Sequence, residues 1–378
     1  MGKTKTNNPT ITAADLLKQV KKECAKCNTL VAKSNIGDVN IEGDNLDFRK
    51  AIPYDMDARI TFDHVTFNKV TSIMAHENTT LIFKRCTFKN FLDFECGDLI
   101  IEQCKMDDIV VCANHSDVNL SKLKLKPLVK IEVNDARNVT LDECKGFERF
   151  FCSRISSSVS VLNSDIEDVT VYNGPGSLIR VKDSKLKEIN VSDASLDRIV
   201  VTKSEISKHI KLKRTSVYND LEIRSNKIKA LKCDMAAIFG EFYYNPAEIE
   251  TLDFDESIGF RPPENEFTMY KTCHVRDKEG TELERVIVQL TVPAKANRVY
   301  CGHLKIRVSE AKVVKFFKID GKPYKLQKGC NVCADYDITF VYKIGKTVKP
   351  VTTFEPGSGA CGPGIHGFVK FVDAVNYE

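Results

Sequence analysis

Residues 159–206 decide the fold, and they read VSVLNSDIEDVTVYNGPGSLIRVKDSKLKEINVSDASLDRIVVTKSEI. In this stretch, pairs of small or aliphatic residues at alternate positions recur every five residues. Examples of these pairs are Ser184/Leu186, Ile189/Val191, Ala194/Leu196, Ile199/Val201 and Ser204/Ile206. An α-helix repeats about every 3.6 residues and a plain β-strand about every 2, so neither produces a period of five. Two inward side chains followed by a turn do produce it, and four such units close one square coil.

A longer period of about 20 residues extends the pattern over most of the chain. Segments such as 60–70, 99–109, 178–189 and 221–231 align on one another, and each repeat carries one residue, mostly small, between apolar positions. These residues are Val65, Cys86, Cys104, Cys144, Ser164, Ser184, Ser204 and Asn226. Repetition at a fixed period is typical of solenoids, in which each repeat buries its inner face against its neighbours. We therefore predict an all-β fold, with a β-helix of about ten coils over residues 36–235.

The column of small residues is interpreted as an inward-facing structural ladder. Free cysteine behaves as a small buried hydrophobe, which suits the inside of a coil. A stacked metal or redox column is the alternative. The chain has 14 cysteines and opens with MGKTKTNNPT, which lacks the apolar core of a signal peptide. We therefore expect reduced thiols and a protein that is not secreted.

The five-residue period resembles that of the pentapeptide-repeat family, whose fold is a right-handed quadrilateral β-helix. In that family a small residue and a larger apolar residue alternate inward within each five, and Ser184/Leu186 and Cys86/Phe88 match this pattern. Val159 and Ile179 place β-branched residues at the small position. The resemblance implies a four-sided rod with some wider faces.

The two ends of the repeat array depart from its pattern. Residues 12–33 are predicted to form an amphipathic helix that begins at Thr12, so residues 1–35 form either a cap on the first coil or a basic arm that docks on a partner. Residues 236–264 carry a cluster of aromatics and then Pro262-Pro263, which favours a cap followed by a linker. Residues 265–378 are predicted to form a separate β-rich domain, because several segments alternate and are rich in β-branched residues.

The last domain contains the stretch CGPGIHGFVKFVDAVNY at 361–377. It resembles a C-terminal domain of unknown function that often follows pentapeptide repeats in proteins of bacteriophages and other large DNA viruses. The recognisable element is a box of the form C-x-x-G-I-H-F-F, followed by A-x-x-Y. The box residues here are Cys361, Gly364, Ile365, His366 and Phe368, with Gly367 in place of the usual aromatic. The resemblance implies no established activity.

The residue types of this box fit two kinds of site, a Cys–His catalytic pair and a zinc site. Cys361 and His366 have the residue types of a nucleophile and its base, but no third group that would orient the imidazole is identifiable. Together with Cys330 and Cys333 they spell C-x2-C-x27-C-x4-H, which is a weak candidate for a tetrahedral zinc site. The simpler interpretation is that His366 bonds a backbone carbonyl and orders the loop. We expect no catalytic residue, no metal and no cofactor.

The net charge and the hydropathy of the chain indicate which kinds of partner to expect. The net charge is +4 overall and −4 over residues 36–250. That is neither the strongly basic balance of a nucleic-acid-binding domain nor the dense negative surface of a DNA mimic. No stretch approaches the roughly 18 apolar residues that span a bilayer. We therefore expect protein partners or self-association, with no membrane and no nucleic acid.

Three function classes remain open at this level. The first is a non-enzymatic structural or interaction protein, with a virus-encoded virion or assembly component as the leading hypothesis. The second is a virus-encoded regulatory module that acts on a host protein. The third is an enzyme or zinc domain centred on Cys361 and His366. The expected location is the virion or the host-cell cytoplasm.

Overall fold

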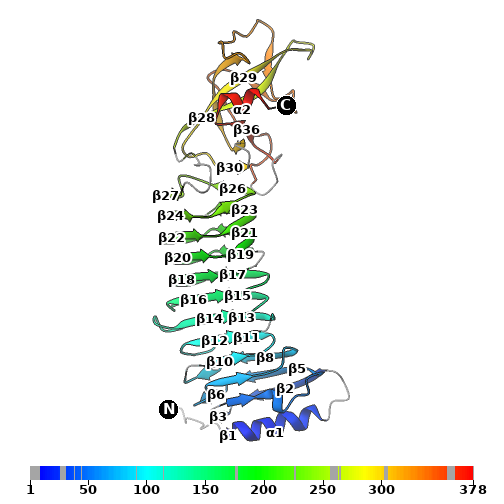
Figure 1. Cartoon of the computed structure of the whole chain (residues 1–378), viewed down its shortest axis with the longest axis vertical. Coiled ribbons are helices and arrows are strands. Elements are labelled where there is room, and N and C mark those ends of the chain that lie inside the picture. Colours follow the sequence, from blue (N-terminus) through cyan, green and yellow to red (C-terminus); the bar gives the residue numbers. More distant parts are fainter. Residues whose placement is uncertain are drawn as a thin grey trace, which may run out of the picture.

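The computed structural model is an elongated, mostly β protein (Figure 1). It describes residues 9–25, 31–37, 39–43, 45–90, 92–113, 115–174, 178–224, 227–255, 263, 265–301, 305–355 and 362–377. Stacked coils form a rod, with a short helix at one end and the C-terminal domain at the other. The predicted fold class, an all-β solenoid with an N-terminal helix, is confirmed.

Parallel sheets run along the rod, and each strand pairs with the strands one coil before and after it. Of the described strands, eleven form one sheet, ordered along the rod as β4 (Asn45–Asp47), β7 (Ser72–Met74), β10 (Leu92–Glu95), β12 (Ile109–Cys112), β14 (Lys130–Asn134), β16 (Arg149–Ser153), β18 (Asp165–Tyr172), β20 (Lys185–Ser192), β22 (Glu205–Lys213), β24 (Lys227–Asp234) and β27 (Ile249–Phe254). The facing sheet contains β2 (Val31–Gly37), β5 (Asp57–Asp63), β8 (Thr79–Lys84), β11 (Leu99–Glu102), β13 (Asp117–Ser121), β15 (Asn138–Asp142), β17 (Ser158–Leu162), β19 (Leu178–Lys182), β21 (Ser195–Thr202), β23 (Ser216–Arg224), β25 (Ala237–Ile238) and β26 (Glu241–Tyr244). A short third sheet near the N-terminus comprises β1 (Thr10–Thr12), β3 (Asn40–Glu42), β6 (Thr66–Asn68) and β9 (Thr87–Phe88).

The small-residue column lies inside the rod. Every described member is at most 3% exposed, and Asn226 lies outside the described residues. Backbone N–H groups donate to the hydroxyls one coil ahead, from Ser164 to Ser184 Oγ and from Ser184 to Ser204 Oγ, each at 3.1 Å. Ser184 Oγ also donates to the carbonyl of Lys182 at 2.8 Å. The ladder thus links successive coils by hydrogen bonds as well as by packing.

The turn before the ladder positions has a backbone conformation that the repeat pattern did not predict. One non-glycine residue per coil there adopts a left-handed conformation, with φ between +49° and +56°. These residues are His64, Arg85, Gln103, Lys122, Glu143, Asn163, Asp183 and Lys203. This backbone costs an L-residue roughly 1–2 kcal/mol. Hydrogen bonds between coils offset the cost, as where Lys203 N donates to Arg224 O at 2.8 Å.

The N-terminal helix is shorter than the predicted 12–33. Helix α1 (Ala13–Cys24) begins at Thr12, whose hydroxyl accepts from Asp15 N at 3.1 Å. Its buried face, which includes Leu16 and Val20, packs at the end of the rod. Strand β2 pairs in parallel with β5 and already belongs to the solenoid. The residues from Val31 onward therefore form part of a solenoid coil and not of a helix or an arm.

The solenoid also continues past the predicted boundary at residue 235. Strands β25 and β26 pair in parallel with β23, and β27 pairs in parallel with β24. Residues 237–254 therefore form a further coil where a cap was predicted, and most of the predicted linker lies outside the described residues. Phe242 and Tyr244 are buried in that coil, whereas Phe239 is 62% exposed and stacks on Tyr218 with ring centroids 5.3 Å apart.

The C-terminal domain is joined to the rod by strand pairing. Its described elements are β28 (Phe267–Arg276), β29 (Glu282–Val292), β30 (Arg298–Cys301), β31 (Lys305–Val308), β32 (Ala311–Lys318), β33 (Asn331–Cys333), β34 (Val341–Tyr342), β35 (Thr347–Val348), β36 (Ile365–Phe368) and α2 (Phe371–Val375). Strand β30 pairs antiparallel with β26 of the last coil. The sheet of the solenoid thus runs into the domain without a break.

Two fully buried arginines reinforce this junction. Arg307 Nη2 lies 3.3 Å from Glu241 Oε2 of the last coil, and Arg307 Nη1 donates to the carbonyl of Glu355 at 2.7 Å. Arg298 Nη2 donates to the carbonyls of Asn265 at 2.9 Å and Pro293 at 3.0 Å. Since each arginine is 0% exposed, these bonds replace part of the hydration that its guanidinium loses on burial.

Candidate functional site: a pocket beside His366

Three of the box residues, Ile365, His366 and Phe368, lie on β36 in the middle of the C-terminal sheet, and Gly364 directly precedes this strand. This strand pairs antiparallel with β31, where Ile365 lies opposite Val308 and His366 opposite Arg307. Phe368 lies opposite both Lys305 and Tyr270 of β28. Cys361 lies outside the described residues.

Close approach of neighbouring chain explains the two glycines of the box. A Cβ on Gly364 would lie 2.4 Å from Arg307 Cγ, and one on Gly367 would lie 2.6 Å from the carbonyl oxygen of Tyr270. Both distances are too short for any side chain. An aromatic side chain at position 367 therefore has no space in this chain.

A pocket of about 730 Å³ opens beside β28, where the strand that pairs with one edge of β28 changes from β36 to β33. Strand β28 pairs with β36 at Tyr270 and with β33 from His274 to Arg276, and the described residues 271–273 between them belong to neither ladder. The pocket is lined by Lys271, Thr272, Lys305, Ala334, Asp335, Tyr336, Asp337, Phe340, Tyr342, Pro350, Val351, Thr352, Gly362, Pro363, Gly364, His366, Gly367, Phe368 and Tyr377. Its volume falls within the range of small-molecule sites.

His366 is held in one tautomer. Its Nε2 lies 2.9 Å from the carbonyl oxygen of Gly362, and because a carbonyl only accepts, Nε2 carries the proton. Its Nδ1 is buried and has no hydrogen-bond partner among the described residues. Burial, together with the positive charges of Lys271, Lys305 and Arg307, lowers the pKa of His366 to about 4, against the opposing effect of the hydrogen bond to Gly362. The imidazole is therefore neutral at neutral pH, with an unused acceptor.

Two lysines supply the charge of the pocket. Lys305 Nζ lies 3.2 Å from the hydroxyl of Tyr377 and 5.0 Å from the centroid of that ring. Lys271 is half-buried on β28. Within the described part of the chain, neither ammonium lies in an ion pair with a carboxylate.

The two carboxylates that line the pocket are engaged elsewhere. Asp335 Oδ1 lies 2.9 Å from His274 Nε2. Asp337 accepts from the backbone N–H of Thr339 at 2.9 Å and from its hydroxyl at 2.6 Å, and these bonds lower the pKa of Asp337. The charges that act on His366 are the positive charges of Lys271, Lys305 and Arg307.

The described residues contain no cluster of side chains that could hold a zinc ion. No group of three or more His, Cys, Asp or Glu side chains there is placed to hold a metal. Cys333 is buried in β33 opposite His274, and Cys330 is half-buried just before it. The twelve cysteines of the described residues are all free thiols, and burial raises the pKa of Cys273 to about 12 and of Cys144 to about 11.

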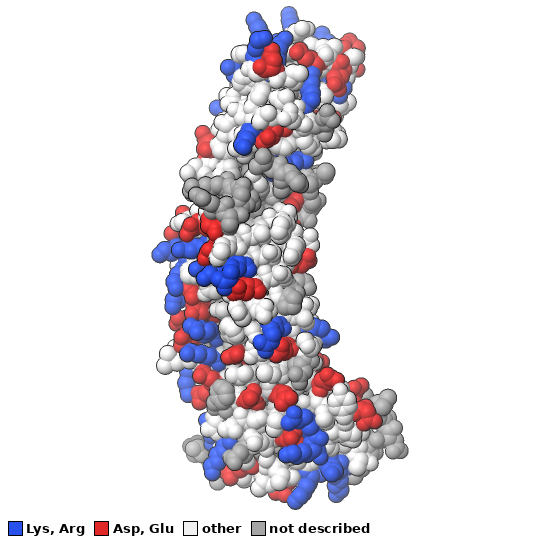
Figure 2. All heavy atoms as spheres, in the orientation of Figure 1, with Lys and Arg blue, Asp and Glu red and all other residues white. Residues whose placement is uncertain are grey.

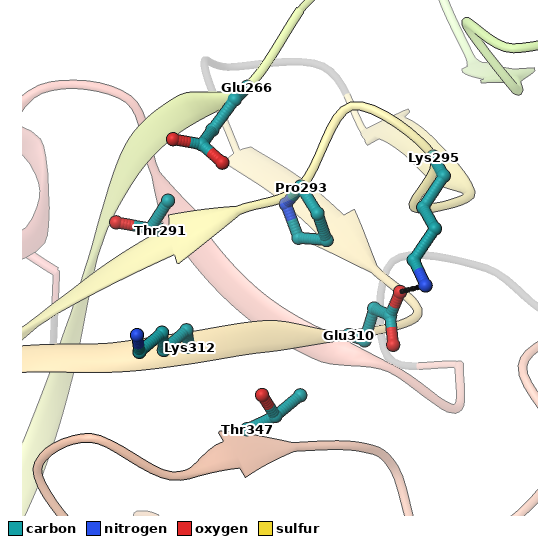
Figure 3. Close-up of a pocket in the computed structure, with 7 residues that line it drawn as sticks. All are labelled: Glu266, Thr291, Pro293, Lys295, Glu310, Lys312 and Thr347. Carbon is teal, nitrogen blue, oxygen red and sulfur yellow. Dashed lines mark ion pairs between the residues drawn. The ribbon is translucent and has the colours of Figure 1, made fainter.

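A smaller pocket of about 250 Å³ lies elsewhere in the domain, between β29, β32 and β35 (Figure 3). Its charges are mixed: Lys295 and Glu310 form an ion pair at 3.7 Å, and Lys349 lies 3.3 Å from the same carboxylate. Because these charges are matched within the protein, this pocket offers less to a ligand than the one beside His366.

We predict that His366 makes the C-terminal domain sensitive to acid. Its pKa of about 4 in the fold lies below the unfolded value of 6.5, so the unfolded chain takes up the proton first as the pH falls. The stabilisation is complete above pH 6.5 and is lost toward pH 4. Between pH 7 and 4.5, the free energy of unfolding should fall about 2 kcal/mol more in the wild type than in His366→Gln. Denaturant titrations of both proteins across this range measure the difference; parallel curves would contradict the assignment.

Most of this site could not be found from sequence. The box pointed to His366, but Lys271, Lys305 and Tyr336 carry no motif and come from separate strands and loops.

No helix in the described residues is long and apolar enough to cross a membrane.

Comparison with known proteins finds one similarity, in the C-terminal domain. Residues 259–374 match the model of a family of unknown function (DUF5758). Neither the curated proteins nor the solved structures include a match to the chain. The family match spans β28 to α2, so the pocket beside His366 lies within the segment that resembles this family of unknown function.

Proposed function

We propose that this protein is a non-enzymatic structural and interaction protein, in which the solenoid serves as a rigid spacer and assembly scaffold. The observation that carries the proposal is the junction between the last coil and the C-terminal domain. Strand β26 pairs with β30, and the buried ion pair of Arg307 and Glu241 crosses the same boundary. A domain attached in this way keeps a fixed orientation on the rod, which a flexible linker would not provide.

The surface of the rod supports protein partners. Basic and acidic side chains alternate along it (Figure 2). Many are paired between adjacent coils, as in Arg154 Nε–Asp135 Oδ1 at 2.6 Å and Arg214 Nε–Asp193 Oδ1 at 2.5 Å. Paired charges cancel at a distance, so this surface lacks the single-sign field that attracts nucleic acid or imitates it.

The biological setting is proposed from the sequence resemblances. The five-residue period resembles pentapeptide repeats, and the C-terminal box resembles a domain that follows such repeats in proteins of large DNA viruses. We therefore assign the chain to a virus-encoded virion or assembly component, with other copies of itself or other virion proteins as partners.

The test combines sedimentation with the composition of particles. Sedimentation velocity of the full chain from about 1 to 100 µM should show concentration-dependent association, since micromolar contacts suffice for assembly. Mass spectrometry of purified particles should find the chain enriched over whole infected cells. A monomer at every concentration that is also absent from particles would overturn the proposal.

A further inference from the structure

We propose that the pocket beside His366 binds a small organic carboxylate that has an apolar body and a hydrogen-bond donor. The site lies in the C-terminal domain, and the proposal is independent of the scaffold role. Three features of the pocket select the three parts of this ligand.

The cationic groups select the carboxylate. Lys271 and Lys305 line the pocket, and neither forms an ion pair with a carboxylate among the described residues. Arg307 also acts on His366, but it is already paired with Glu241. In a partly desolvated cavity, an uncompensated positive charge favours an anion. A carboxylate that reached Lys271 and Lys305 would provide it.

His366 selects the donor. Because its Nε2 is committed to Gly362, the ring cannot turn to satisfy its buried Nδ1 with a neighbouring group. An unsatisfied buried acceptor costs roughly 1–3 kcal/mol. A ligand hydroxyl or amide N–H that reached Nδ1 would remove this cost, whereas an ether or ester oxygen would repel its lone pair.

The walls select the apolar body. Phe340, Tyr342 and Phe368 line the cavity, and its rim carries two large apolar side chains, Tyr336 at 88% and Val351 at 80% exposed. Exposed apolar groups beside a cavity mark a binding site more often than isolated surface residues do. Covering an aromatic or branched ligand would remove this surface from water.

Three probes of similar size separate these features. 4-Hydroxybenzoate has the carboxylate, the ring and the donor; 4-methoxybenzoate lacks the donor, and 4-hydroxybenzamide lacks the charge. Isothermal titration of the full chain should give 4-hydroxybenzoate an affinity at least about tenfold higher than either analogue. The NMR signals of the His366 ring should shift with that probe, and the bound carboxylate should raise the pKa of His366.

Matched variants locate the binding. Lys271→Met and Lys305→Met should each weaken 4-hydroxybenzoate about tenfold or more, and Lys271→Arg should retain binding. Lys322→Met is the control, because that side chain is 79% exposed and lies next to Asp320, away from the pocket. Thermal melting confirms that each variant is folded, and Lys305→Arg replaces Lys305→Met if the latter is not. Equal affinity for the three probes, unchanged binding by the lysine variants, or no binding of 4-hydroxybenzoate at about 10 mM would each overturn the proposal.

Discussion

Replacing Arg307 with Met should lower the free energy of unfolding by about 3–5 kcal/mol, measured as the first transition in a denaturant titration. The Arg307 side chain is 0% exposed and contacts Glu241, whose side chain is only 11% exposed. Removal of the guanidinium leaves a carboxylate buried at the junction without its cation. It also leaves the carbonyls of Glu355 and Pro363 without this donor.

Two further proteins test the cause of that loss. Arg307→Met combined with Glu241→Leu should recover at least half of the lost stability, because no charge then remains buried. Arg85→Met removes a partner of Asp63 on the open surface of the rod, where the Arg85 side chain is 48% exposed. That change should cost less than about 1 kcal/mol. If Arg307→Met were no more harmful than Arg85→Met, the junction would not depend on the buried pair.

Replacing Ser184 with Lys should prevent the central coils from stacking. Ser184 is 3% exposed, and its Oγ accepts from Ser164 N at 3.1 Å while its own N–H donates to Ser204 Oγ. A lysine there would bury an unpaired ammonium, which costs at least several kcal/mol, and would overfill the coil. We expect insoluble protein, or a thermal midpoint far below that of the wild type by circular dichroism.

Two control variants in the same coil separate the effect of the buried charge from the effect of changing any residue there. Ser184→Ala keeps the volume but removes the hydroxyl, and should cost about 1–2 kcal/mol. Lys185→Ser changes the next residue, whose side chain is 69% exposed, and should stay within about 0.5 kcal/mol of the wild type. Soluble Ser184→Lys protein with unchanged melting would show that the ladder does not face inward.

The candidate site was only partly accessible from sequence. The box drew attention to Gly364, Ile365, His366 and Phe368 because their types and spacing form a motif. The zinc hypothesis and the nucleophile hypothesis both include Cys361, which lies outside the described residues, so both stay predictions. Lys271 and Lys305 belong to strands whose alternation predicts β-structure but says nothing about which strand lies beside which.

The solenoid could be recognised from the printed sequence because its contacts are regular. Each inward residue packs on its counterpart about 20 residues away, so the same short pattern must recur in every coil. The repeat pattern does not predict where the solenoid begins and ends. It places Val31 in a helix and residues 237–254 in a cap, although both belong to coils of the solenoid. The junction at Arg307 and the pocket at His366 depend on antiparallel pairings between distant segments that do not repeat. Such pairings leave no period in the chain, so they became visible only when the strands were placed in space.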